Sequence, residues 1–326
     1  MFLHRPETAA RIMITGASGF VGQKLIRRLA DAAPDTVVIP VHGPLSVDGS
    51  LSVDLGDFAA CLGLVQEVRP TVIVHLAALS SVGTTMNAPT GVWRSNFDGT
   101  HALARAALSL AEEVRFVFAS SGEVYGTQFN NGPCDEQSPL APVSPYARTK
   151  AACEYLLNDL SSENLSVVAL RLFNHSGPGQ DERFVIPSFA AQVARLDRGG
   201  RGGQIKVGNL AASRDFSDIE DIVDAYLAVI LHKVPLPRFS IYNVGSGENR
   251  SIQSIVTTLI GLAAVPIETV TDPSRMRPSD IAAAAGVFDR FRAEFGWVPK
   301  RSFDTTIAHV LEDQRDRLAR AGLEVG

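Results

Sequence analysis

A strand, a glycine-rich turn and a helix follow one another near the start of this chain, and this order constrains its fold more than any other feature. Residues 11–15 form a short apolar run, which indicates a buried strand, and residues 25–29 carry the apolar spacing of a helix. Between them lie Gly16, Gly19 and Gly22. Small residues at these positions permit a tight turn, a close approach of the backbone to a pyrophosphate, and close contact between helix and strand. The sequence therefore predicts a dinucleotide-binding unit at this point.

Strand-like and helical patterns alternate through the first half of the chain. The apolar runs that predict strands lie at residues 36–41, 71–77, 115–121 and 166–173, and the main helical patterns lie at residues 91–111 and 144–160. Alternation of this kind is typical of a parallel sheet that is covered by helices on both faces. We therefore expect an α/β fold with a Rossmann-type doubly wound sheet, whose ligands bind at the carboxyl ends of its strands.

The pattern becomes less regular after residue 173, which indicates a second, smaller domain. Ser217 and Glu220 have the spacing of a capping box at the start of a further helix. We expect a dinucleotide-binding domain at residues 1–173 with re-entrant segments near 215–245, interleaved with a substrate-binding domain formed mainly by residues 174–326. The elements expected in this half are a helix from about residue 185, a helix that ends at residue 230, and strands at residues 204–208 and 240–244.

The composition is that of a globular protein, and it excludes some partners. Hydrophobic residues make up 45% of the chain and charged residues 20%, with a formal net charge of -5, so no basic surface for nucleic acid or anionic lipid is expected. The three cysteines, Cys61, Cys134 and Cys153, lack the spacing of metal ligands, and we expect free thiols, no metal and a reducing compartment. Because neither a signal peptide nor a membrane-spanning apolar run is evident, we expect a soluble cytoplasmic protein without membrane partners.

Tyr146 and Lys150 carry the chemistry that is most clearly visible in the sequence. They lie four residues apart, so a helix places both side chains on one face. Ser144 is a favourable N-cap and Pro145 a favourable first helical residue, which predicts a helix that begins just before the pair. An ammonium group beside a phenol favours the phenolate and is expected to lower the tyrosine pKa from about 10 towards the working pH. The pair therefore indicates proton transfer.

Further motifs accompany the glycine turn and the tyrosine-lysine pair. They are "VDLGD" around Asp54, "HLAA" at residues 75–78 and "SSGEVYG" at residues 120–126. With them the chain resembles, over its whole length, the extended short-chain dehydrogenases/reductases that act on nucleotide sugars, the NAD-dependent epimerase/dehydratase family. Later motifs resemble the GDP-4-keto-6-deoxy-D-mannose reductase branch of that family: "RLFNHSGPGQ" at residues 171–180, "FVIPSF" at 184–189, "VGNLAASRDFSDIEDIVDAY" at 207–226 and "DPSRMRPSD" at 272–280.

The resemblance implies roles for four residues in catalysis. Ser121 would hold the reacting oxygen of the substrate, Tyr146 would donate the proton, and Lys150 would bind the nicotinamide ribose and tune the tyrosine. Glu123 is ambiguous, because sugar 4,6-dehydratases that resemble this chain use a glutamate there as a base. Gly122 stands where those dehydratases tend to carry an acidic or hydroxyl side chain.

The resemblance also implies an NAD or NADP cofactor, with Asp54 against the adenine and residues 76–78 along the groove. The strand before His42 ends in neither the acidic residue that binds a ribose hydroxyl of NAD nor an arginine for the extra phosphate of NADP, so the choice stays open, with NADPH favoured. Asn96, a poor helix former in a predicted helix, is expected to bridge backbone groups as a structural residue. The expected cofactor-binding residues are Gly16, Ser18, Gly19, Phe20, Val21, Gly22, Asp54, Leu55, Leu76, Ala77, Ala78, Tyr146, Lys150 and Leu172.

The same resemblance implies a set of residues that bind a GDP-sugar substrate. Asn174 and the arginines of the later motifs would contact the diphosphate and nucleoside, and Val207 would lie near the base. Arginine suits phosphate because its guanidinium group donates two parallel hydrogen bonds. The expected substrate-binding residues are Ser80, Asn174, Val185, Val207, Arg214, Arg275, Arg277 and Asp280.

The function that the resemblance implies is an NAD(P)H-dependent reduction of the C4 ketone of GDP-4-keto-6-deoxy-D-mannose. The product would be a GDP-6-deoxyhexose, either GDP-rhamnose or its talose epimer. Three alternatives remain open: a GDP-mannose 4,6-dehydratase, a nucleotide-sugar 4-epimerase, and a non-enzymatic redox sensor that binds a nucleotide. The resemblance further suggests a homodimer formed through the helices at residues 91–111 and 144–160.

Overall fold

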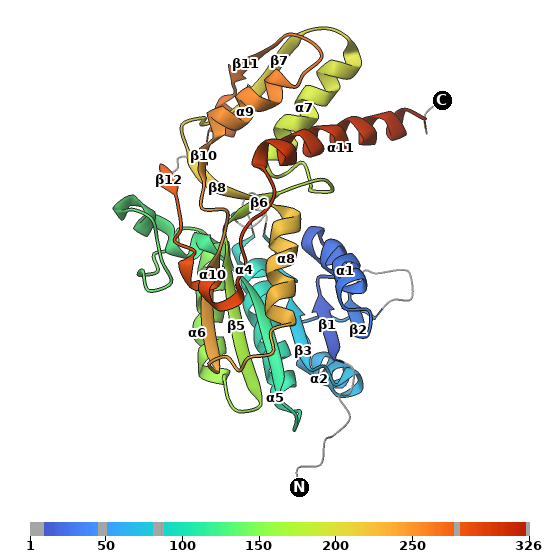
Figure 1. Ribbon diagram of the computed structural model, residues 1–326, viewed down its shortest axis with the longest axis vertical. Helices are drawn as coiled ribbons and strands as arrows, with labels where there is room; N and C mark the ends of the chain where they lie inside the picture. Colours follow the sequence, from blue (N-terminus) through green and yellow to red (C-terminus); the bar gives the residue numbers. More distant parts are fainter. Residues whose placement is uncertain (1–9, 45–50, 81–85, 87, 277–280, 324–326) are drawn as a thin grey trace. The chain divides into compact units, whose positions relative to one another are not determined.

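The chain forms two compact units (Figure 1). The computed structural model describes residues 10–44, 51–80, 86, 88–276 and 281–323. Unit 1 consists of Met1–Val124, Pro142–Leu172 and Val223–Tyr242, and unit 2 consists of Tyr125–Ala141, Phe173–Ile222 and Asn243–Gly326. The domain boundaries expected from the sequence, 1–173 and 174–326, stay a prediction. Within the described ranges, no helix has both the length and the apolar character needed to cross a membrane.

A six-stranded sheet forms the centre of unit 1. Its strands are β1 (Arg11–Thr15), β2 (Val37–Val41), β3 (Val72–His75), β4 (Val114–Ser121), β5 (Leu165–Leu172) and β9 (Phe239–Val244). The order is β2-β1-β3-β4-β5-β9, and the neighbouring pairs from β2 to β5 are parallel. The order reverses between β1 and β3, which is where doubly wound sheets bind their ligands. The predicted Rossmann-type α/β fold is confirmed.

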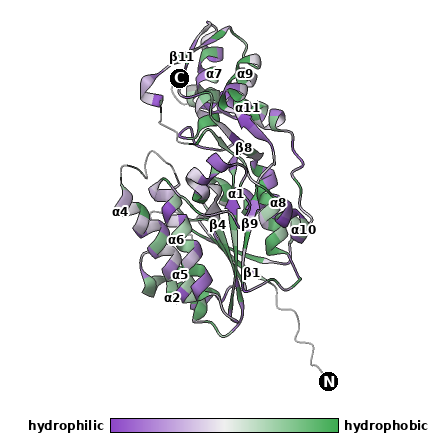
Figure 2. Cartoon of the chain, turned by 90° about the vertical axis from the view of Figure 1, so that its left-hand side faces the viewer, coloured by the Kyte–Doolittle hydropathy of each residue, from purple (hydrophilic) through white to green (hydrophobic). Residues whose placement is uncertain are grey.

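Helices cover both faces of this sheet (Figure 2). They are α1 (Phe20–Ala32), α2 (Phe58–Val68), α4 (Pro89–Val92), α5 (Gly99–Leu108), α6 (Pro145–Leu160) and α8 (Ile219–Ile230). Helices α2, α5 and α6 lie on one face, and α1 and α8 lie on the other. Arg28 of α1 forms an ion pair with Asp224 of α8, with 2.9 Å between Nε and Oδ1. This pair connects the re-entrant helix α8 to α1.

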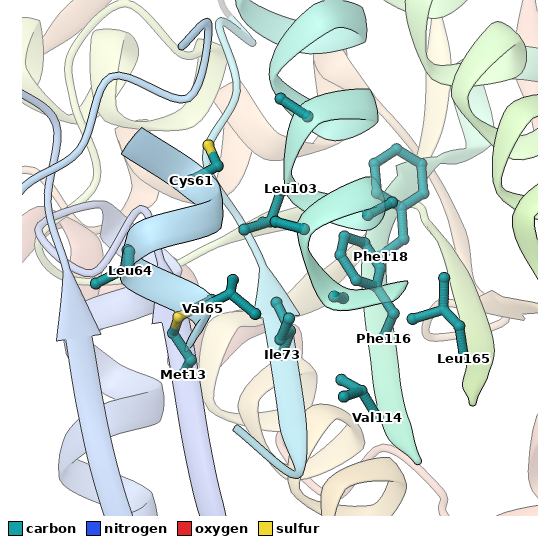
Figure 3. Close-up of a cluster of buried hydrophobic side chains, with 14 of the residues drawn as sticks. Met13, Cys61, Leu64, Val65, Ile73, Leu103, Val114, Phe116, Phe118 and Leu165 are labelled. Carbon is teal, nitrogen blue, oxygen red and sulfur yellow. The ribbon is translucent and has the colours of Figure 1, made fainter. Parts of the chain in front are cut away.

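Apolar side chains fill the space between the sheet and helices α2 and α5 (Figure 3). Met13 of β1, Ile73 of β3, Phe116 of β4 and Leu103 of α5 are fully buried in one cluster. Full burial of a side chain of this size contributes about 1.5–3 kcal/mol. The cluster is the physical reason for the nearly continuous apolar runs that predict the strands, and it fixes the positions of the strand ends.

The helix that the sequence predicts at residues 91–111 is interrupted. Helix α4 is followed by a π-helical segment, η1 (Trp93–Asp98), before α5 begins. In this segment Asn96 accepts a hydrogen bond from the backbone N–H of Leu79 at 2.8 Å and donates one to the Leu79 carbonyl at 3.1 Å. The Asn96 carbonyl accepts from the Thr100 hydroxyl at 2.6 Å. These bonds draw the segment out of regular helical geometry, and they agree with the expected bridging role of Asn96.

Unit 2 is built from small sheets and the helices that pack on them. The strands are β6 (Asn174–Ser176), β7 (Gly203–Val207), β8 (Ser213–Asp218), β10 (Asn249–Ser251), β11 (Ile267–Thr271) and β12 (Ala283–Ala284). The helical segments are α7 (Val185–Gly199), α9 (Ile252–Gly261), η3 (Pro273–Arg275), α10 (Asp289–Phe295) and α11 (Phe303–Leu323). Strand β8 pairs with β6, β10 and β12, whereas β7 pairs with β11. Helices α7, α9 and α11 pack together through a shared apolar core (Figure 1).

The predicted capping box at the start of α8 is wrong. Ser217 lies in β8, and its buried hydroxyl has no hydrogen-bond partner within the part of the chain that the structure describes. Asp218 takes the capping role, because its Oδ1 accepts from the backbone N–H of Glu220 at 2.7 Å. Its Oδ2 accepts from the Thr306 hydroxyl at 2.6 Å, which ties the start of α8 to α11. The sequence offers two adjacent capping residues, and the length of β8 selects the second.

A buried histidine on β3 connects this strand to β1 and to α5. His75 ends β3; its Nδ1 lies 2.7 Å from the Thr15 hydroxyl and its Nε2 lies 3.0 Å from the Thr100 hydroxyl. Because Thr100 donates its own proton to the Asn96 carbonyl, Nε2 carries the ring proton and Nδ1 is the acceptor. Burial, and to a smaller extent the charge of Lys150, lowers the pKa of His75 to about 3. The imidazole is therefore neutral in the folded protein.

We predict that His75 makes the folded protein sensitive to acid. Its pKa rises from about 3 to the ordinary 6.5 on unfolding, so the unfolded chain binds an additional proton between these values. The stabilisation is complete above pH 6.5 and is lost as the pH falls towards 3, at up to about 1.4 kcal/mol per pH unit. In denaturant titrations across this range, His75→Gln should lose unfolding free energy less steeply than the wild type. His101→Gln on α5 is the matched control, and a wild-type slope in His75→Gln would contradict the assignment.

Candidate active site

Helix α6 begins as the sequence predicts and carries the tyrosine-lysine pair on one face. The Ser144 hydroxyl accepts from the backbone N–H of Ala147 at 3.1 Å, and Pro145 follows Ser144 as the first helical residue. Tyr146 is half-buried, and Lys150 is only 3% exposed one turn later. The Lys150 Nζ lies 5.8 Å from the centre of the Tyr146 ring. The predicted N-cap is confirmed, and the two functional groups are neighbours.

The end of β4 lies against this face of α6. The Lys150 Nζ donates to the Ala119 carbonyl at 2.6 Å and lies 4.7 Å from the centre of the Phe118 ring. Two residues further along the strand, the Ser121 hydroxyl forms a hydrogen bond with Tyr146. The structure therefore brings Ser121, Tyr146 and Lys150 together at the carboxyl end of a central parallel strand.

Glu123, the fourth residue that the resemblance assigns to catalysis, is exposed. It stands at the start of a 3-10 segment, η2 (Gly122–Asn131), and its backbone N–H donates to the Ser121 hydroxyl at 3.2 Å. Its carboxylate is close enough to Tyr146 to raise the pKa of the phenol. The neighbouring Gly122 has no side chain that could act as a second acid.

The expected lowering of the Tyr146 pKa is wrong. Burial is the largest influence and raises the pKa of the phenol, the Glu123 carboxylate raises it further, and the hydrogen bond with Ser121 lowers it. The ammonium group of Lys150 points to the Ala119 carbonyl, which explains why its charge does not dominate. The phenol therefore keeps its proton at neutral pH and is suited to act as a proton donor.

The turn between β1 and α1 has the geometry of a dinucleotide cradle. Gly16 has a φ of +71°, and a Cβ atom on it would lie 2.7 Å from the backbone nitrogen of Ala77. A Cβ atom on Gly22 would lie 2.4 Å from the Gly16 carbonyl oxygen. Gly19 is the N-cap of α1 and provides no side chain for the first N–H groups of the helix. Backbone donors that are not covered by side chains suit a pyrophosphate, so these residues fit an NAD(P) cofactor.

The other predicted cofactor residues lie near the ends of the strands of unit 1. Leu76 follows β3, and its backbone N–H donates to the Thr15 carbonyl at 3.2 Å. Asp54 is exposed, and its Oδ1 accepts from the backbone N–H of Gly56 at 2.9 Å. Leu172 is buried at the end of β5. The remaining predicted residues of unit 1 are all exposed or half-buried, and they are Ser18, Phe20, Val21, Leu55, Leu76, Ala77, Ala78 and Ser80. Their contacts with a cofactor or substrate stay a prediction.

A pocket in unit 2 brings two of the predicted substrate residues together. Asn174 begins β6 and Val185 begins α7, and both line this pocket. Burial lowers the pKa of His175 in the same pocket, so its imidazole is neutral there. The further lining residues are Ser176, Gln180, Phe184, Ile186 and Phe216. The pocket combines amide, imidazole and aromatic groups, a mixture that can both pack against and hydrogen-bond a ligand.

The remaining predicted substrate residues have different surroundings. Arg214 is half-buried in β8, and its Nη1 donates to a backbone carbonyl of its own strand at 2.7 Å. Arg275 is exposed, with its Nη1 3.3 Å from the Ser188 hydroxyl on α7. Val207 is 2% exposed in the apolar core of unit 2. Arg277 and Asp280 lie outside the described residues.

The chain matches a known protein family over most of its length. A family model described as GDP-mannose 4,6 dehydratase matches residues 13–310. The chain belongs to this family of extended short-chain dehydrogenases/reductases. It is thus an NAD(P)-dependent nucleotide-sugar enzyme, and the family resemblance drawn from the motifs is confirmed.

Relatives within this family differ in their reactions. A GDP-6-deoxy-D-mannose reductase from Pseudomonas aeruginosa is 33% identical over 310 residues, which cover 94% of this chain and 98% of the relative. A UDP-glucose 4-epimerase from Mycolicibacterium smegmatis is 31% identical over 328 residues, covering 94% of this chain and 99% of the relative. The solved structure of RMD from Pseudomonas aeruginosa complexed with NADPH has a TM-score of 0.82 at 31% identity, and covers 95% of this chain and 100% of that one.

Sequence reasoning missed three buried residues near Lys150, which are Ser120, Glu154 and Arg171. Glu154 stands one turn after Lys150 on α6, with its Oε2 2.7 Å from Arg171 Nη2 and its Oε1 2.5 Å from the Ser120 hydroxyl. The signal was present in the periodicity, because Glu154 continues the helix face of Tyr146 and Lys150. Arg171 is likewise a charged residue at the end of an otherwise apolar strand. Charged residues at positions where the pattern predicts burial mark such networks.

We predict that one added methyl group in the glycine turn weakens dinucleotide binding. Gly22→Ala would place Cβ 2.4 Å from the Gly16 carbonyl oxygen, so the turn must open. The affinity for NADPH in a fluorescence titration should fall by about tenfold or more, or by about 1.4 kcal/mol. Gly63→Ala in α2 is the matched control, because nothing lies within 4 Å of its added Cβ. Equal affinities of the two variants would show that the turn does not hold the dinucleotide.

Proposed function

We propose that this protein reduces the C4 ketone of GDP-4-keto-6-deoxy-D-mannose with NADPH or NADH. The product is a GDP-6-deoxyhexose, GDP-rhamnose or its talose epimer. The similarity to a GDP-6-deoxy-D-mannose reductase along almost the whole chain supports this reaction. The observation that carries the proposal is the grouping of three side chains at the end of β4, where Tyr146 is hydrogen-bonded to Ser121 and its ring centre lies 5.8 Å from Lys150 Nζ.

Three side chains of unit 1 divide the work of the reaction. When bound, the reduced nicotinamide supplies a hydride to the ketone carbon. The Ser121 hydroxyl hydrogen-bonds the ketone oxygen and polarises it. Tyr146 gives its proton to that oxygen as negative charge develops there. Lys150 binds the ribose hydroxyls and stabilises the phenolate that Tyr146 becomes, while Gly16, Gly19 and Gly22 leave room for the pyrophosphate.

The protonated phenol of Tyr146 is the form that a reduction requires at its start. A raised pKa keeps the proton on the phenol until charge develops on the substrate oxygen. An epimerase or a dehydratase of this kind must first remove a proton from a sugar hydroxyl, which requires the phenolate. An epimerase and a dehydratase use the same three side chains, so the choice of the reductase rests on the similarity to a GDP-6-deoxy-D-mannose reductase.

A GDP-mannose 4,6-dehydratase is the second candidate, and Glu123 is the observation that favours it. Its exposed carboxylate lies near Tyr146, where a base could abstract a proton beside a ketone. The matching family model also carries this description. Gly122 argues against the dehydratase, because it offers no acid to protonate a departing hydroxyl.

For the cofactor and partners, we propose NADPH, a GDP-sugar and a second copy of the chain. NADPH is supported by the absence of an acid at residues 41–44 and by the similarity to RMD, which was solved with NADPH. We assign Asn174, Arg214 and Arg275 to the nucleoside diphosphate. Exposed aromatic side chains on η1 and α6, Trp93 and Tyr155, support the proposed homodimer, because a partner would cover them.

The decisive assay offers the purified protein two substrates and follows nicotinamide absorbance. GDP-mannose is supplied alone, and then a dehydratase-generated 4-keto-6-deoxy sugar is supplied with NADPH or NADH. Consumption of the reduced cofactor with the keto-sugar only is the expected result. Release of keto-sugar from GDP-mannose without net cofactor consumption would instead identify a dehydratase. No reaction with either would require UDP-sugars to be tested for epimerisation, and inertness there would leave the redox-sensor alternative.

We predict that Tyr146→Phe removes turnover without removing nucleotide binding. The phenylalanine keeps the ring and loses the proton that the product oxygen needs, so kcat should fall by about a hundredfold or more. The affinity for NADPH should stay within about twofold, because the glycine turn is unchanged. Tyr155→Phe on the exposed face of α6 is the matched control. Unchanged kcat in Tyr146→Phe would exclude the phenol as the proton donor.

A further inference from the structure

We propose that Glu154 is a positioning residue of the active site, whose buried carboxylate keeps Lys150 charged and aligns the end of β4. Only the catalytic consequence of this inference rests on the proposed function. The charge of Lys150, which is its main observable, can be measured without any reaction. It adds to the catalytic group a residue that touches neither substrate nor cofactor. The evidence is the way in which α6 and β4 are joined.

Three consecutive residues of β4 are held by three residues of α6. Lys150 donates to the Ala119 carbonyl at 2.6 Å, Glu154 accepts from the Ser120 hydroxyl at 2.5 Å, and Tyr146 is hydrogen-bonded to the Ser121 hydroxyl. The α6 residues are spaced four apart, so they lie along one face of the helix. Glu154 is therefore the third member of a regular series whose first two members are the proposed catalytic pair.

Arg171 fixes the carboxylate of Glu154 in place. Its Nη2 lies 2.7 Å from Oε2, and its Nε lies 3.1 Å from Oε1 and 3.2 Å from Oε2. Glu154 and Arg171 are each 3% exposed. A buried ion pair contributes little to stability by itself, because both charges lose their hydration, so its presence calls for another reason. With Ser120 on one side and Arg171 on the other, the carboxylate is held one turn from Lys150.

The surroundings of Lys150 contain charges of both signs. Burial lowers the pKa of Lys150 to about 8, whereas Cys153 and Glu154 raise it. The charge of Lys150 in turn lowers the pKa of His75, which is neutral and offers no compensating negative charge. Asp98 acts on Cys153 from η1, and the exposed Glu123 acts on Tyr146 from η2. The titratable or charged groups that face the lysine are Tyr146, Cys153 and Glu154 from α6, His75 from β3 and Arg171 from β5, and Glu154 is the buried anion among them.

Loss of this anion has a defined consequence for the reaction. Without the Glu154 charge, burial acts on Lys150 unopposed by a carboxylate, and the ammonium group loses its proton at lower pH. A neutral lysine does not stabilise the phenolate that Tyr146 becomes during the reaction. The alkaline limb of the pH profile of kcat should therefore move to lower pH.

The sequence allows the charge of Lys150 to be measured directly. The chain contains five lysines, Lys24, Lys150, Lys206, Lys233 and Lys300. Isotope-labelled lysine thus gives few side-chain signals in an NMR titration, and Lys150→Arg identifies the signal of Lys150. In Glu154→Gln the pKa of Lys150 should fall by about one pH unit or more relative to the wild type. Asp159→Asn, which removes an exposed carboxylate from the same helix, is the matched control and should leave the Lys150 signal unchanged.

A second variant guards against loss of folding. Glu154→Gln leaves Arg171 buried without its partner, which can destabilise the protein. The double variant Glu154→Gln/Arg171→Met removes both charges. Lys150 should again titrate at lower pH than in the wild type, but by a smaller interval than in Glu154→Gln, because loss of the Arg171 cation partly offsets loss of the anion. A melting temperature that falls while the Lys150 pKa stays at the wild-type value in either folded variant would reduce Glu154 to a structural role and overturn the proposal.

The lysine titration tests the role of Glu154, and the activity measurement tests the proposed reaction, so either hypothesis can be contradicted without the other. Turnover of the keto-sugar in Glu154→Gln should show an alkaline limb displaced by about the same interval as the lysine signal. If the Lys150 signal is displaced in Glu154→Gln but the wild-type protein does not turn over the keto-sugar, the proposed reaction is contradicted and the role of Glu154 stands. An undisplaced signal in a protein that does turn over the keto-sugar would contradict the role of Glu154 alone.

Discussion

The buried ammonium group of Lys150 is the constraint on which the arrangement of unit 1 depends. A cation that leaves water must be compensated by hydrogen bonds and opposite charge, and here the compensation comes from the Ala119 carbonyl, the Phe118 ring and the Glu154 carboxylate. These contacts define the separation of α6 from β4. The same packing leaves the Tyr146 phenol hydrogen-bonded to Ser121 on the adjoining strand.

Much of the fold could be predicted because its signals are local. The apolar runs of β1, β3, β4 and β5 reflect burial on both faces of a parallel sheet, which leaves little room for polar residues. The glycine turn could also be predicted from the sequence, because Gly16 and Gly22 lie where a Cβ atom would collide with neighbouring backbone. The cap at Ser144 depends only on the residues that follow it. Each of these features is decided within a few residues of the sequence.

The features that sequence reasoning missed depend on partners that are distant along the chain. The π-helical segment around Asn96 is tied to Leu79, and the choice of Asp218 over Ser217 as the cap of α8 depends on where β8 ends. The pKa of Tyr146 depends on burial and on Glu123, neither of which follows from the spacing to Lys150. Arg171 and Glu154 had charge as a signal, but only the fold shows that they meet. Residues that a distant segment orients cannot be read from local periodicity.

The return of residues 223–242 to unit 1 has a consequence for how the protein is made. Strand β9 completes the sheet beside β5, and the backbone N–H of Val167 donates to the Arg238 carbonyl at 2.7 Å. While a ribosome is still translating the intervening stretch, β5 is an open edge with unpaired amide and carbonyl groups, and such edges invite pairing with other nascent chains. The sheet can therefore be completed only after β9 has emerged from the exit tunnel. Until then β5 is an apolar edge strand with one unpaired side, which chaperones can shield.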